Sequence, residues 1–129
     1  MNIMKNKKLF WTIFSIVAVI VVSIALLPKP IDMNLEQIGN GQKAVVFVYD
    51  SNLLDSNRQA TEMNKARKHI GDQAIFLIAK TGDPDGEDFK SRYQARSLEL
   101  LFFNKKGELI DRQIAVLSAE ELTGKLSGK

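Results

Sequence analysis

An uncharged apolar run near the start of the chain constrains its fold more than any other feature. Residues Leu9 to Leu27 read LFWTIFSIVAVIVVSIALL, nineteen residues without an acid or a base. The hydrocarbon core of a bilayer, roughly 30 Å thick, needs about 20 apolar residues in a helix. In lipid the backbone must satisfy its own polar groups, which favours a helix. The run also lacks the polar face that a helix of a soluble protein would have. The sequence therefore predicts a transmembrane helix over residues 9–27.

The charges on either side of the run predict its orientation. Lys5, Lys7 and Lys8 precede it, whereas Lys29 is the base that follows closely. Because lysine-rich flanks stay in the cytoplasm, residues 1–8 are predicted to be a cytoplasmic leader and the rest of the chain to be exported. The short lysine-rich leader is typical of a bacterial inner-membrane protein, whose exported part lies in the periplasm or on the outer face. In a eukaryote the same pattern would face a lumen or the exterior.

A cleaved signal peptide is the alternative interpretation. Ser23-Ile24-Ala25 resembles a small-x-small cleavage site, and the charged leader fits the region that precedes a signal peptide's core. The apolar run is longer than the roughly 7–15 residues of such a core, and Leu26 and Leu27 continue it past the supposed cut. We therefore expect an uncleaved anchor. No cysteine follows the run, so a lipoprotein anchor is excluded.

The positive charge of the chain belongs to its leader. The formal net charge is +3, and from residue 28 onward fifteen Lys plus Arg balance fifteen Asp plus Glu. Nucleic acid is bound by concentrated positive charge, so this exported part is not expected to bind it. It also contains no cysteine and can form no disulfide. The stability of its roughly 100 residues, the size of one small domain, must come from a hydrophobic core.

Residues 28–42 are predicted to form a stalk, and residues 43–129 an α/β domain. Pro28 and Pro30 disfavour continuation of the helix, and Asn40-Gly41 is typical of a turn just before the domain. Apolar periodicity then predicts strands at 43–50, 73–79, 99–104 and 108–115, and helices at 55–70, 84–95 and 118–126.

Polar residues at the helix starts support these boundaries. We expect Asp55 or Ser56 to cap the first helix, and Asp83 to cap the second, with Pro84 in its first turn. Ser118 and Glu121 have the spacing of a capping box for the third helix. The first strand–helix–strand unit should be parallel and the last two strands a hairpin. The predicted fold is a four-stranded mixed sheet with helices on both faces.

This order and two stretches of sequence resemble the thioredoxin family. AVVFVYDSNLLDSNRQ, beginning at Ala44, resembles the thioredoxin strand that leads into the active-site loop and helix. LELLFFNKKGELIDRQIAVLSAEEL, beginning at Leu98, resembles the C-terminal hairpin, its Phe-Asn-Lys-Lys-Gly turn and the last helix. The resemblance covers about 85 residues and implies a thioredoxin-like fold.

The departures from the family concern its chemistry. The stretch that matches the family's Cys-x-x-Cys is Leu53-Leu54-Asp55-Ser56, so both sulfur positions are lost. The position that matches the family's cis-proline is Leu98, and a cis bond before a non-proline residue costs about 2.5–4 kcal/mol, so we expect a trans bond. Redox, disulfide-isomerase and thiol-peroxidase activities all need a thiolate and are excluded.

The resemblance implies a binding surface at the carboxyl ends of the strands, where open α/β sheets hold ligands and thioredoxin-like domains hold an extended peptide. It consists of Asp50, Ser51, Asn52, Leu53, Leu54, Asp55, Ser97 and Leu98. The alternative is that Leu53 and Leu54 merely pack on the sheet and that residues 50–52 form a turn.

Other residues give weaker indications, and we expect no catalytic residue, cofactor or metal. His69 lies near a helix end, where a partly charged imidazole is mildly favourable. The acids Asp83, Asp85, Glu87 and Asp88 lack the glutamate that a calcium loop needs at its twelfth position, here Gln94, and fit an acidic helix start instead.

The function expected from the sequence is a non-enzymatic, membrane-anchored adaptor or accessory subunit that binds a protein partner in the cell envelope, as part of a larger membrane complex. One alternative is a non-redox enzyme with Ser51 or Ser56 as a hydroxyl nucleophile. Another is a subunit whose transmembrane helix is the main interaction element, through its small residues Ser15, Ala18, Ser23 and Ala25.

Overall fold

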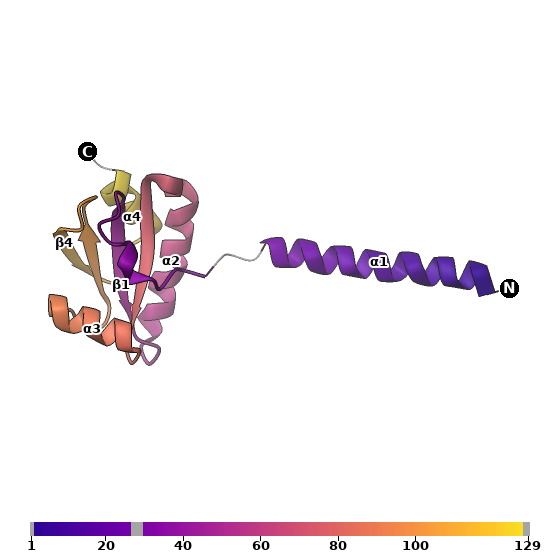
Figure 1. Cartoon of the computed structure of the whole chain (residues 1–129), viewed down its shortest axis with the longest axis horizontal. Helices are drawn as coiled ribbons and strands as arrows, with labels where there is room; N and C mark the ends of the chain where they lie inside the picture. The colour runs from indigo at the N-terminus through magenta and orange to yellow at the C-terminus, as the bar shows by residue number, and fades with distance from the viewer. Residues whose placement is uncertain (1, 27–29, 128–129) are drawn as a thin grey trace. The chain divides into compact units, whose positions relative to one another are not determined.

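The computed structural model describes residues 2–26 and 30–127, and the chain divides into two compact units, Met1–Pro30 and Ile31–Lys129. The first unit contains one helix, α1 (Asn2–Leu26), drawn in indigo in Figure 1. By length and composition, its stretch Asn6–Ile24 could cross a membrane. The helix begins at Asn2, so residues 2–8 of the leader are helical too. Met1 and Leu27, the predicted end of the span, lie outside the described residues.

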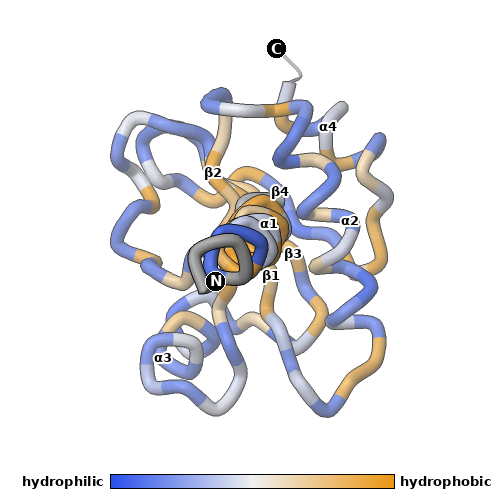
Figure 2. The backbone as a smooth tube through the Cα atoms, turned by 90° about the vertical axis from the view of Figure 1, so that its right-hand side faces the viewer, coloured by the Kyte–Doolittle hydropathy of each residue, from blue (hydrophilic) through white to orange (hydrophobic). Residues whose placement is uncertain are grey.

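The second unit is built on a four-stranded mixed sheet in the order β2-β1-β3-β4. The strands are β1 (Lys43–Tyr49), β2 (Ala74–Lys80), β3 (Glu99–Phe103) and β4 (Leu109–Ile114). β1 and β2 are parallel, and β3 and β4 form an antiparallel hairpin, as the sequence predicted. β3 is also antiparallel to β1. Apolar residues concentrate along the central strands, whereas much of α2 and α3 is hydrophilic (Figure 2).

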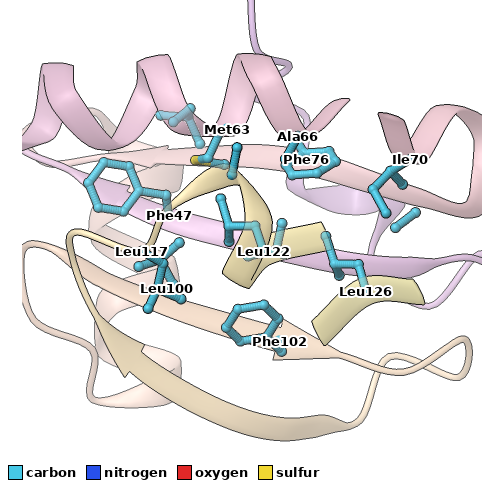
Figure 3. Close-up of a cluster of buried hydrophobic side chains, with 14 residues drawn as sticks. Phe47, Met63, Ala66, Ile70, Phe76, Leu100, Phe102, Leu117, Leu122 and Leu126 are labelled. Atoms are coloured by element: carbon cyan, nitrogen blue, oxygen red, sulfur yellow. The ribbon is translucent and has the colours of Figure 1, made fainter. Parts of the chain in front are cut away.

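Helices α2 (Leu54–Ile70) and α4 (Ala119–Ser127) cover one face of the sheet. Met63, Ala66 and Ile70 recur at helical spacing on α2 and point toward the sheet, where α4 adds Leu122 and Leu126 (Figure 3). Burial of each of the larger side chains, such as Met63 or Leu122, contributes roughly 1.5–3 kcal/mol. The strand residues that meet these side chains are Val45, Phe47, Phe76, Ile78, Leu100 and Phe102.

Helix α3 (Pro84–Tyr93) covers the opposite face. Phe89 and Tyr93 pack their rings against Phe103, with centroids 6.2 and 5.2 Å away. α3 approaches β2 so closely that a Cβ on Gly86 would lie 1.9 Å from the carbonyl oxygen of Lys80, which only glycine avoids. This close approach lets the short helix seal its side of the core.

The compact unit that contains the sheet begins at Ile31, twelve residues before the domain start that the sequence predicted. The N–H of Ile78 in β2 donates to the carbonyl of Asp32 at 2.9 Å, and η1 (Leu35–Gln37) follows. Leu35 and Ile38 then pack against the α3 side of the core. These apolar side chains are too widely spaced among polar residues to form a recognisable pattern.

The helix starts differ from the predicted caps. The N-cap of α2 is Leu53, which has no side-chain hydrogen bond, so the prediction of Asp55 or Ser56 as cap is wrong. Asp83 is the N-cap of α3 with Pro84 in the first turn, but its side chain does not cap either. At α4 the Ser118 Oγ accepts the N–H of Glu121 at 3.1 Å, as one half of a capping box requires.

Candidate functional site

The loop after β1 forms the centre of the predicted surface. The Asp50 carboxylate accepts the N–H of Asn52 at 3.0 Å, and the Asp50 carbonyl accepts the N–H of Leu53 at 3.0 Å. The N–H of Asp50 in turn donates to Ser56 Oγ at 2.9 Å. Three hydrogen bonds thus hold a tight turn between the strand and α2, as one of the sequence interpretations expected for residues 50–52.

A second segment joins this loop at the end of the sheet. Ser97 Oγ donates to the other oxygen of the Asp50 carboxylate at 3.1 Å, and the Thr81 hydroxyl lies 3.5 Å from the same Ser97 oxygen. The N–H of Leu98 donates to Val48 and its carbonyl accepts the N–H of Ala115, both at 2.9 Å. The predicted residues of the two segments are therefore brought together.

The backbone at Leu98 is unusual. Its φ of +73° lies in the left-handed region, which is unfavourable for a bulky residue, and its two backbone hydrogen bonds hold it there. The Ser97–Leu98 bond is trans, as expected, and the cis peptide bond found in the described residues joins Ala115 and Val116. The strained position lies where thioredoxins place their cis-proline, by the match proposed above.

The leucines of the loop are exposed. Leu54, the first residue of α2, is 70% exposed, and Leu53 is 39% exposed. The interpretation that both leucines simply pack on the sheet is therefore wrong for Leu54. Ser51 and Asn52 are exposed, and Asp55 is half-buried and pairs with Arg58 at 3.4 Å. An exposed leucine at a helix start costs solubility without adding to the core, which makes it a candidate contact for a partner.

Two exposed apolar residues at the same end of the sheet were not predicted from the sequence to belong to this surface. β4 runs in the same direction as β1, because both are antiparallel to β3, so Ile114 and Val116 lie at the end where Leu53 and Leu54 lie. Their exposed fractions are 61% and 41%. The sequence held one signal for their exposure: the apolar residues of β4 do not all fall on one face of the strand, so some of them must point away from the core. We call Leu53, Leu54, Ile114 and Val116 the apolar rim.

A buried glutamine fixes the segment that carries Val116. Gln59 of α2 is fully buried, and its side-chain amide donates to the Leu117 carbonyl at 3.0 Å while its oxygen accepts the Leu117 N–H at 2.7 Å. Both polar groups of Leu117 are satisfied by one side chain. No sequence pattern distinguishes this glutamine from an ordinary polar residue on the solvent face of α2.

The two serines of the loop differ in their exposure to solvent. Ser56 is fully buried and its hydroxyl accepts the Asp50 N–H, so it cannot reach a substrate. Ser51 is exposed, but the single histidine, His69, is at the far end of α2. Within residues 2–26 and 30–127, no three His, Cys, Asp or Glu side chains gather as metal ligands would. The chain contains no cysteine, so no thiol stands beside the Asp50 loop.

Comparison with known proteins bears on the fold. No protein-family model and no curated protein matches the chain. Among solved structures it is similar to a thioredoxin-2 described as a component of malaria parasite protein secretion machinery, with 18% identity and a TM-score of 0.62 over 68% of this chain and 84% of that one. An uncharacterised thioredoxin-like protein from Clostridium perfringens has 15% identity and a TM-score of 0.64, over 76% and 79% of the two chains.

A third similar structure is the exposed lipoprotein thioredoxin of Streptococcus pneumoniae strain TIGR4, with 16% identity and a TM-score of 0.61 over 69% of this chain and 86% of that one. At such low identity these structures define a class of fold. The domain has a thioredoxin-like fold, preceded by an apolar helix that could span a membrane, and it carries no cysteine.

Proposed function

We propose that this protein is a non-catalytic, membrane-anchored adaptor or accessory subunit whose thioredoxin-like domain binds a protein partner in the cell envelope. The observation that carries the proposal is the apolar rim, with Leu54 70% exposed beside the Asp50 loop. Exposed apolar groups next to satisfied polar ones are typical of contact surfaces. Without a cysteine, the end of the sheet can hold a partner but cannot exchange a disulfide with it.

The proposal places the domain outside the cytoplasm. It takes α1 as the anchor and the lysines at positions 7 and 8 as the cytoplasmic flank, which leaves the domain in the periplasm or on the outer face. The pneumococcal neighbour, described as an exposed lipoprotein, supports a thioredoxin-like domain held at a cell surface. The partner would be another protein of the same membrane or envelope.

Photocrosslinking in intact membranes tests the proposal. A photoreactive residue replaces Leu54, and the matched control replaces Lys105, which is exposed in the turn between β3 and β4 at the other end of the sheet. We expect a discrete adduct from Leu54 and none from Lys105. Equal adducts, or none, would contradict a binding role for the rim.

Two further variants separate the proposal from its rivals. Replacing α1 by an unrelated transmembrane helix should preserve function, since the domain makes the contact, and loss of function would favour the helix as the interaction element. Ser51→Ala should complement a deletion fully. Failure of that variant to complement, with the protein still folded, would favour a hydroxyl enzyme.

A further inference from the structure

A groove on the helical layer lies away from the apolar rim. It has a volume of about 690 Å³ and runs between the C-terminal half of α2 and α4. α4 lines it with residues at helical spacing, so that one face of this helix is turned to the groove: Ala119, Glu120, Thr123, Gly124 and Ser127. α2 supplies Lys65, Lys68 and His69. Both helices thus present one regular face to the same hollow.

Gly124 is not explained by the folding of the domain. Glycine disfavours a helix, and Gly124 lies in the interior of α4 without the positive φ that would require it. A Cβ added there would meet nothing within 4 Å, so no neighbour in the domain demands its small size either. A glycine without such reasons fits a position at which another backbone approaches closely.

The wall of the groove formed by α2 is basic. Lys65 pairs with Glu62 of its own helix at 3.0 Å. Lys68 and His69 are exposed, and within the described part of the chain neither side chain has a hydrogen bond or an ion pair. Glu120 is the one acid among the lining residues. Two lysines against one glutamate leave the lining with a small excess of positive charge, at Lys68, which favours a ligand that carries a carboxylate there.

We propose that this groove binds an acidic amphipathic helix of a partner protein. Small residues four and five apart on α4 allow a third helix to pack at the usual interaxial distance of about 8–10 Å, with its apolar face on Ala119, Thr123 and Gly124. Glutamates or aspartates along one edge of that helix would then reach Lys68 and His69. A hollow between two helices fits a third helix better than a flat layer of lipid headgroups.

The test uses the full chain in nanodiscs of neutral phosphatidylcholine. The probe is a fluorescent synthetic helix with an alanine–leucine face and glutamates at i, i+3 and i+4, and its matched control carries lysines at the same positions. Fluorescence anisotropy should show that the glutamate helix binds at least about tenfold more tightly than the lysine helix. Equal affinities, or no binding of the glutamate helix, would overturn the proposal.

Two variants locate the binding. Gly124→Leu fills the groove and should weaken binding at least about tenfold, while its melting temperature should not fall because leucine favours a helix and the position is open. Lys68→Glu should weaken binding similarly, and Lys105→Glu should not change it. Binding that survives Gly124→Leu would show contact elsewhere. The groove is about eleven residues along α2 from Leu54, so crosslinking from Leu54 should be unaffected by Gly124→Leu.

Discussion

Replacing Gln59 by leucine tests how the end of the sheet is held. The side chain is fully buried and makes two hydrogen bonds to the backbone of Leu117, at 3.0 and 2.7 Å. Leucine fills a similar volume, so the main loss is the pairing of one buried N–H and one buried carbonyl. Each buried group left unpaired costs about 1–3 kcal/mol, so the two together give an expected loss of about 2–6 kcal/mol. A small domain has only about 5–15 kcal/mol in all.

The assay is urea unfolding of the compact unit Ile31–Lys129, which contains every buried core residue of the described chain. We expect the urea concentration at the midpoint of unfolding to fall. The slope of the unfolding free energy against urea concentration should stay unchanged, because the surface exposed on unfolding is the same. Gln73→Leu is the matched control: Gln73 is exposed, and its substitution should change stability by no more than about 0.5 kcal/mol. A loss below about 1 kcal/mol for Gln59→Leu would refute the pairing with Leu117.

Three other perturbations follow from the packing and charge of the domain. Gly86→Ala should destabilise it by about 3 kcal/mol or more, measured by urea unfolding, because the new Cβ meets a β2 carbonyl oxygen at 1.9 Å; an unchanged midpoint would contradict this contact. Arg112→Met should cost about 2 kcal/mol, because Arg112 pairs at 3.2 Å with the nearly buried Glu99 carboxylate, and no loss would mean that water replaces the pair. The Lys125 ammonium lowers the pKa of Asp111 below its usual 3.8, so its stabilising effect is full above that pH and is lost as pH falls through the lowered value; Lys125→Met should flatten this acid limb of a pH–stability curve.

The order and type of the elements could be predicted because each strand and helix carries its own periodicity. β1 is apolar on both faces and lies between β2 and β3, and α2 repeats its apolar residues at Met63, Ala66 and Ile70. The antiparallel hairpin was predicted from its Lys105-Lys106-Gly107 turn, and Gly107 does adopt a positive φ of 86°. In these segments local sequence and tertiary packing favour the same structure.

Features that depend on distant contacts could not be predicted. The segment after Ile31 docks because one backbone carbonyl, that of Asp32, finds an N–H in β2, which no local pattern encodes. Ser56 is a good cap by composition, yet its hydroxyl is taken by the Asp50 N–H across the loop. Of the candidate site, the proximity of Asp50 to Ser97 was predicted, but the exposure of Ile114 depends on how far the helices extend over the sheet.

The docking of residues 31–42 has a mechanical consequence. A slack linker would absorb tension applied at Pro30, whereas here the load reaches the sheet edge at once, through the hydrogen bond between the Asp32 carbonyl and Ile78. Leu35 and Ile38 then pack against the core, and the next hydrogen bond to the rest of the domain runs from the Gly41 N–H to the Lys105 carbonyl, at 3.1 Å. Tension would therefore peel this segment from β2 before it reaches β1. Residues 31–42 would therefore detach first, and the Asp50 loop would keep its structure.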